Sequence, residues 1–108
     1  MDYIIGCDIG TTSVKAVAFS LTGDVLNSES ASYPMFHPEP GYAEQDPEEI
    51  YSQTIQILDK LTTAMGDKPV ALSFSSAMHS LMALDERGNS TSPLIIWADN
   101  RSGFLANE

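Results

Sequence analysis

Hydrophobic positions near the start of the chain follow two patterns that are typical of β-strands. A continuous apolar run over residues 3–8 predicts a strand buried on both faces. Over residues 13–20, apolar positions 14, 16 and 18 alternate with positions 15, 17 and 19, which is strand periodicity. A turn at residues 21–24 leads into a more polar strand over 25–33, expected near a sheet edge or with one wet face. The three strands predict an antiparallel meander.

The next apolar pattern has helical spacing. After a proline-marked loop, Asp46 is expected at the N-cap, Pro47 at the first helical position and Glu49 in the first turn. Apolar residues then recur every three or four positions from Ile50 to Met65, and Gly66 suits the helix end. One helix face should therefore pack on the sheet.

Beyond the helix the strand signals become shorter. Residues 70–74 predict another buried strand, and 81–84 and 94–97 predict two short strands separated by a turn at 85–89. A helix start is expected from residue 100. The resulting β-β-β-α-β order predicts an α/β fold with a mixed sheet, in which a parallel strand joins the antiparallel meander.

Length, charge and cysteine content narrow the class of protein. The 108 residues, 43% of them hydrophobic, suffice for one small domain with a core. A net charge of -10 argues against nucleic acid or an anionic membrane surface as partner, because both require basic residues. Cys7 is the only cysteine, so neither an internal disulfide nor a cysteine metal cage can form. With no apolar run of about 20 residues and no basic signal region, we expect a cytoplasmic protein.

The stretch DIGTTSVK at residues 8–15 carries the main chemical signal. Asp8 ends an apolar strand and can hold Mg²⁺ directly or through water. Gly10 lets the backbone approach a ligand without a Cβ in the way. Turn N–H groups and the hydroxyls of Thr11, Thr12 and Ser13 can donate to phosphate oxygens. The alternative is an ordinary β-hairpin whose small residues serve the turn.

Lys15, at the start of the second strand, is a candidate charge partner for phosphate, unless strand alternation points it to solvent. The turn lies between two strands rather than between a strand and a helix. The sequence also lacks the glycine-rich patterns of dinucleotide-binding and P-loop sites. A dinucleotide-binding site and a P-loop are therefore both excluded.

Four motifs in order resemble the beginning of the FGGY carbohydrate kinases: DIGTTSVK at 8–15, GYAEQDP at 41–47, SAMH at 76–79 and WADNR at 97–101. They extend over nearly the whole chain. The fuller string SFSSAMHS at 73–80, with WADNRS at 97–102, is most similar to the gluconate kinase branch, and xylulose kinases come next.

The resemblance implies a ribonuclease-H-like, actin-like ATPase fold, with ATP and Mg²⁺ as cofactors. Members of the family are several times longer, so residues 1–108 are expected to be the N-terminal part of the first kinase domain. The second domain, the catalytic base and the adenosine pocket would lie outside them. We therefore expect the 108 residues alone to lack kinase activity.

The resemblance also assigns roles to the later motifs. Asp8 is the catalytic and metal-binding candidate, and Gly10, Thr11, Thr12, Ser13 and Lys15 are the nucleotide-phosphate candidates. Substrate contact is assigned to Met78, His79, Trp97, Asp99 and Arg101. For each of these the sequence leaves a structural alternative: loop packing for Met78, a satisfied polar residue for His79 and core packing for Trp97. For Asp99 and Arg101 the alternative is a local salt bridge, although the planar guanidinium also suits the carboxylate of an aldonate.

The sequence therefore predicts the N-terminal part of an ATP-dependent kinase that phosphorylates a terminal hydroxyl of an open-chain sugar or sugar acid, with gluconate first. Xylulose or another FGGY substrate is the nearest alternative. An actin-type ATPase and a non-catalytic binding module are the others. The expected partner is a small-molecule substrate, and a homodimer stays open.

Overall fold

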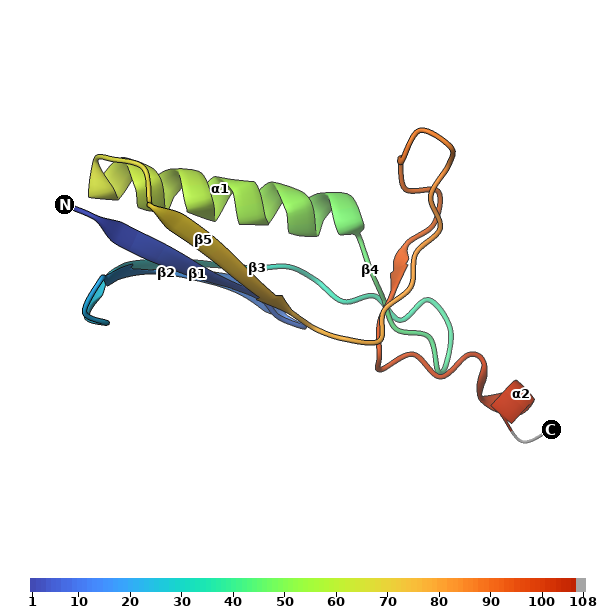
Figure 1. Cartoon of the computed structure of the whole chain (residues 1–108). Helices are drawn as coiled ribbons and strands as arrows, with labels where there is room; N and C mark the ends of the chain where they lie inside the picture. Colours follow the sequence, from blue (N-terminus) through green and yellow to red (C-terminus); the bar gives the residue numbers. More distant parts are fainter. Residues whose placement is uncertain (107–108) are drawn as a thin grey trace. The chain divides into compact units, whose positions relative to one another are not determined.

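A computed structural model describes residues 1–106 of the chain (Figure 1). Within it the backbone forms two compact units. The first contains residues 1–33 and 48–77, and the second contains residues 34–47 and the chain from Met78 onward. Each unit has its own set of secondary-structure elements.

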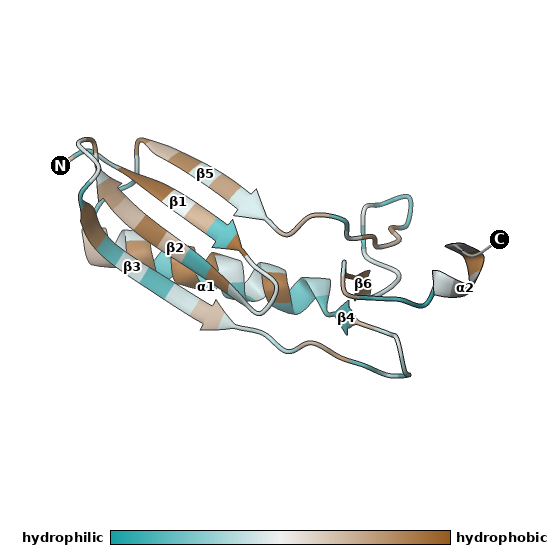
Figure 2. Cartoon of the chain, turned by 90° about the horizontal axis from the view of Figure 1, so that it is seen from below, coloured by the Kyte–Doolittle hydropathy of each residue, from teal (hydrophilic) through white to brown (hydrophobic). Residues whose placement is uncertain are grey.

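The first unit is built on a four-stranded sheet with the order β3-β2-β1-β5. Strands β1 (Tyr3–Ile9), β2 (Ser13–Ser20) and β3 (Val25–Ser32) form the predicted antiparallel meander. Strand β5 (Ala71–Ser76) pairs with β1 in parallel, as the β-β-β-α-β order predicted. The polar strand β3 lies at one edge of the sheet, also as predicted (Figure 2).

Helix α1 (Pro47–Met65) covers one face of this sheet (Figure 1). Its buried residues Thr54, Ile57 and Leu61 are spaced three and four apart, which confirms the predicted apolar face. The helix ends at Gly66, whose φ of 78° and N–H bond to the Thr62 carbonyl at 3.0 Å match the expected glycine termination. The core lies between α1 and the sheet, and its members are Tyr3, Ile5, Cys7, Val14, Ala16, Ala18, Tyr33, Ile57 and Leu61.

The opposite face of the sheet is open, and this corrects two expectations. Strand β1 is buried only on the α1 side: Ile4 is 36% exposed and Asp8 is exposed. Every residue of β5 is exposed, including Phe74 at 54%. Both segments were predicted to be buried because their residues are apolar. Apolar residues tend to be buried, but α1 is the only element that packs on the sheet among the described residues of this unit. It covers one face of the sheet and leaves the other exposed (Figure 2).

The second unit has little regular structure. Strands β4 (Glu44–Gln45) and β6 (Leu94–Ile95) form a two-residue antiparallel pair, and α2 spans Gly103–Ala106. The predicted strand over 94–97 is thus shorter. The one over 81–84 is wrong, because Leu81 and Leu84 form only isolated bridges. The helix expected from residue 100 begins at Gly103, and residues 107 and 108 lie outside the described part.

No helix in the described part of the chain is long and apolar enough to cross a membrane.

Candidate functional site

Asp8 lies at the end of β1 on the open face of the sheet. Strand alternation produces this orientation, because Tyr3, Ile5 and Cys7 point into the core beneath α1. The Asp8 carboxylate is exposed, and its Oδ1 accepts a hydrogen bond from Ser75 Oγ at 2.7 Å. Asp8 and Ser75 are direct neighbours in the parallel register of β1 and β5.

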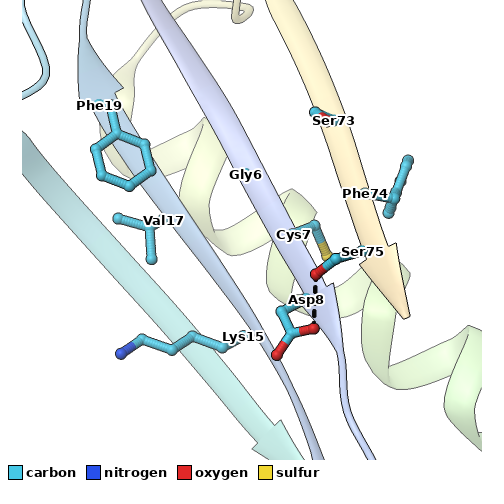
Figure 3. Close-up of a pocket in the computed structure, with 9 residues that line it drawn as sticks. All are labelled: Gly6, Cys7, Asp8, Lys15, Val17, Phe19, Ser73, Phe74 and Ser75. Atoms are coloured by element: carbon cyan, nitrogen blue, oxygen red, sulfur yellow. Dashed lines mark hydrogen bonds between the residues drawn. The ribbon is translucent and has the colours of Figure 1, made fainter. Parts of the chain in front are cut away.

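A groove of about 300 Å³ lies along this face, with Asp8 at its polar end (Figure 3). Lys15 is the cross-strand neighbour of Asp8 on β2 and lines the same groove. Its side chain points away from the Asp8 carboxylate in Figure 3, and no ion pair joins the two among the described residues. The lining comprises Gly6, Cys7, Asp8, Lys15, Val17, Phe19, Ser73, Phe74 and Ser75.

The turn between β1 and β2 closes tightly. The Gly10 N–H donates to the Ser13 carbonyl at 2.8 Å. A Cβ added at Gly10 would lie 3.0 Å from that same oxygen and 3.8 Å from Asp8 Oδ2. Glycine is therefore favoured here by close backbone approach. Thr12 is exposed, while Thr11 and Ser13 are half-buried. The turn thus presents small and hydroxyl-bearing residues next to the Asp8 carboxylate.

Tyr33 holds this turn from beneath. Its buried hydroxyl donates to the Gly10 carbonyl in a very short hydrogen bond and to the Ser13 carbonyl at 3.0 Å. The Tyr33 N–H also donates to the Thr12 carbonyl at 3.2 Å. Burial, followed by the nearby negative charge of Asp8, raises the pKa of the Tyr33 hydroxyl. Because this side chain stays protonated, it remains a donor throughout the physiological pH range.

This arrangement fits a magnesium-bound polyphosphate. Asp8 Oδ2 accepts no hydrogen bond from the described residues, so one carboxylate oxygen can take a cation or its water shell. Within residues 1–106 no three acidic, histidine or cysteine side chains gather as a metal cage. Mg²⁺ suits such a site, since it is commonly held by one or two carboxylates together with water and substrate phosphates.

In the second unit, Asp99 and Arg101 contact each other directly. Arg101 Nε lies 2.9 Å from both carboxylate oxygens of Asp99, and Arg101 Nη2 lies 2.5 Å from Glu44 Oε2. The guanidinium also stacks over the Tyr42 ring, 3.9 Å from its centroid. Asp99 Oδ1 additionally accepts the Ala43 N–H at 2.7 Å. The local salt bridge that the sequence left open is therefore present.

These contacts shift both titrations. The hydrogen bond from Arg101, followed by those from the Ala43 and Arg101 N–H groups, lowers the pKa of Asp99 from 3.8 to about 2. Hydrogen bonds to Asp99 and then Glu44 raise the pKa of Arg101. A substrate carboxylate at Arg101 would have to share the guanidinium with two carboxylates already bound to it.

Met78, His79 and Trp97, the other substrate candidates, also belong to the second unit. Met78 is 70% exposed, and Trp97 is 57% exposed, so core packing of Trp97 is wrong. His79 has a φ of 63°, a left-handed conformation that is uncommon outside glycine. Such residues concentrate at functional sites, where the surrounding structure maintains the strain.

The predicted residues thus form two groups. Asp8, Lys15 and the 10–13 turn adjoin one another in the first unit. In the second, Met78 adjoins His79 and Asp99 contacts Arg101.

Sequence reasoning missed three partners of these residues: Ser75, Tyr33 and Glu44. Ser75 lies one residue beyond the strand predicted over 70–74, and only the register of the β1–β5 pair places it beside Asp8. Tyr33 and Glu44 act across 20 or more residues of chain, and no local pattern marks such contacts.

Residues 3–107 match the FGGY family of carbohydrate kinases, N-terminal domain. The gluconokinase of Bacillus subtilis is 50% identical over 107 residues, which are 98% of this chain and 21% of that protein. The chain thus spans about a fifth of the length of the curated relatives it matches.

Solved structures agree with this match. A xylulose kinase from Lactobacillus acidophilus has a TM-score of 0.95 at 36% identity, covering 99% of this chain and 22% of the other. A gluconate kinase from the same species has a TM-score of 0.94 at 37% identity, covering 98% and 22%. These likenesses confirm the predicted ribonuclease-H-like fold, and the family match argues against an actin-type ATPase.

Proposed function

Because the chain belongs to the FGGY family of carbohydrate kinases, we propose that residues 1–108 form the N-terminal part of the first domain of a gluconate kinase. The whole enzyme would transfer the γ-phosphoryl group of ATP to a terminal hydroxyl of gluconate, in the cytoplasm. The observation that supports gluconate is the 50% identity to gluconokinases, against 40% for a xylulose kinase. Xylulose is the second candidate, because the solved neighbours include both enzymes at nearly equal similarity.

On the nucleotide side, the roles follow from the geometry around Asp8. Asp8 Oδ2 would hold Mg²⁺ or its water shell. Gly10 would let the turn backbone approach the β- and γ-phosphates, and the N–H groups and hydroxyls of residues 11–13 would donate to them. Lys15, exposed at the same groove, would add positive charge. Bound Mg²⁺ would neutralise phosphate charge during transfer, and the turn would hold the phosphates in line. The Tyr33 hydrogen bonds keep that turn in one conformation.

On the substrate side, we assign direct contacts to the exposed residues Met78, His79 and Trp97. The indole face of Trp97 suits the apolar face of a polyol, and the His79 imidazole suits a hydroxyl. Asp99 and Arg101 would contribute by holding the loop at residues 42–44, since their polar atoms are already bonded within the unit. Any contact of Arg101 with the carboxylate of gluconate would come from its remaining donors.

A chimera tests this function. This chain would replace the 107 matched residues of the Bacillus subtilis gluconokinase. We expect ATP- and Mg²⁺-dependent phosphorylation of gluconate, with Asp8→Asn lowering kcat at least about 100-fold. A folded chimera that keeps its rate with Asp8→Asn would contradict the role of Asp8.

A second chimera, in the Lactobacillus acidophilus xylulose kinase, separates the two substrates. If this chain favours gluconate, the first chimera keeps the host's KM for gluconate and the second loses efficiency toward xylulose. The opposite pattern would support the xylulose alternative. The 108-residue chain assayed by itself should show no turnover, and activity above background would overturn that expectation.

A further inference from the structure

Two neighbouring strands bring a hydroxyl group to the Asp8 carboxylate. Ser75 on β5 is the parallel neighbour of Asp8 on β1, and its Oγ donates to Asp8 Oδ1 at 2.7 Å (Figure 3). Both side chains project from regular strands within one sheet. The backbone atoms that carry donor and acceptor are therefore held by the sheet's own hydrogen bonds.

The two oxygens of Asp8 are consequently unequal. Oδ1 is bound to Ser75, whereas Oδ2 faces the turn, 3.8 Å from the point where a Cβ on Gly10 would lie. An exposed aspartate without a partner would exchange between staggered χ1 states. The serine hydrogen bond selects the state in which Oδ2 points to the turn at residues 10–13.

The chemistry of the partner also matters. Lys15 is the other cross-strand neighbour of Asp8, yet its ammonium points away and forms no ion pair with it in the described chain. A neutral hydroxyl orients a carboxylate and leaves its full negative charge for a cation. An ammonium would orient it and cancel that charge.

We propose that Ser75 is a positioning residue, whose hydroxyl holds Asp8 Oδ1 so that Oδ2 is directed at the magnesium–phosphate site. This inference rests on the proposed role of Asp8 as the magnesium ligand. It adds that Ser75 fixes the orientation of the Asp8 carboxylate. Outer partners of metal ligands act in this way, and losing one typically weakens metal affinity or activity 10- to 100-fold.

The first test needs neither metal nor nucleotide. In the 108-residue chain, three-bond Hα–Hβ couplings report the χ1 populations of Asp8. We expect one dominant rotamer in the wild type and in Ser75→Thr, which keeps the hydroxyl, and averaged couplings in Ser75→Ala. Ser28→Ala is the matched control, because Ser28 is exposed on β3 and pairs with the groove residue Val17, but lies outside the groove. A single Asp8 rotamer in Ser75→Ala would overturn the proposal.

The second test uses the gluconokinase chimera and measures the Mg²⁺ concentration that gives half-maximal rate. Ser75→Ala should raise it about 10-fold, whereas Ser75→Thr and Ser28→Ala should leave it within about twofold. If Asp8→Asn abolishes activity while Ser75→Ala changes neither rotamer nor magnesium requirement, only the role of Ser75 fails. If Asp8→Asn is itself harmless, the proposed function of Asp8 fails first.

Discussion

The Asp99 carboxylate accepts a hydrogen bond at 2.7 Å from the backbone N–H of Ala43, 56 residues earlier in the chain. The same carboxylate binds Arg101, which in turn binds Glu44 beside Ala43. One aspartate therefore ties the loop before α1 to the segment that carries Trp97. Because the second unit has only two-residue strands, these side-chain contacts replace much of the sheet pairing that would otherwise define it.

This relationship predicts a pH dependence of stability. The folded pKa of Asp99, about 2, is below its ordinary value of 3.8, so the carboxylate stabilises the folded state fully above about pH 4. That contribution is lost as the pH falls from about 4 toward 2, because both states then bind the proton. Urea unfolding of the wild type and Asp99→Asn should differ by a constant amount from pH 5 to 7 and converge toward pH 2. A difference independent of pH down to 2 would contradict the assignment.

A pair of glycines on the first strand and its turn provides a matched stability test. Gly10→Ala should lower the free energy of unfolding by about 1–2 kcal/mol, because its Cβ would meet the Ser13 carbonyl at 3.0 Å. Gly6→Ala is the control, since its Cβ would lie at an ordinary 3.6 Å from the Phe19 ring. It should be neutral or stabilising by about 0.5 kcal/mol, as alanine is favoured over glycine inside a strand. Equal effects of the two changes, measured by urea denaturation, would refute the close-approach argument.

The hydroxyl of Tyr33 should matter more than its ring at the turn. Tyr33→Phe keeps the buried ring and removes the donor to the Gly10 and Ser13 carbonyls, so stability should fall by about 1–2 kcal/mol. Amide hydrogen exchange at residues 10–13 should accelerate in the variant. Tyr51→Phe, on the 66% exposed Tyr51 of α1, should change neither quantity. Unaltered exchange in Tyr33→Phe would mean that the turn is held by its own backbone bonds.

Because His79 has a left-handed backbone conformation, different substitutions can test its backbone and its side chain separately. His79→Gly and His79→Asn should keep stability within about 1 kcal/mol, because both residues accept a positive φ. His79→Val should lose about 2 kcal/mol, since a β-branched residue is strained there. In the gluconokinase chimera, His79→Gly should raise KM for the sugar about 10-fold, in keeping with one lost hydrogen bond. An unchanged KM would remove the imidazole from the substrate site.

Sequence patterns predicted the first unit well because its elements are specified locally. The alternation over residues 13–20 and the Asp46-Pro47 helix start each depend on neighbours a few positions away. The same reasoning failed for residues 70–74, which were predicted to be a buried strand but are exposed. Hydrophobicity predicts that a strand tends to be buried, but which element buries it depends on the tertiary structure.

For the second unit, the sequence identified candidate residues but not the side-chain contacts that those residues make. The WADNR motif at 97–101 identified Asp99 and Arg101, whereas their partners Ala43 and Glu44 lie more than 50 residues away. Such long-range pairs have no periodicity. The strand predicted over 81–84 was wrong because its pairing is interrupted: Leu81 pairs with Ile95 and Leu84 with Ser90 as isolated bridges rather than as one continuous ladder.

The exposed edge strand β5 has a practical consequence for handling the polypeptide. Among the described residues β5 is an edge strand, so the backbone groups on its outer side can pair with another extended segment, and the strand carries no charge to prevent this. Mutual repulsion between molecules, each with a net charge of -10, is then the main protection against precipitation. Concentrated samples should therefore stay clear at low ionic strength and near-neutral pH, and turn cloudy when salt screens that repulsion.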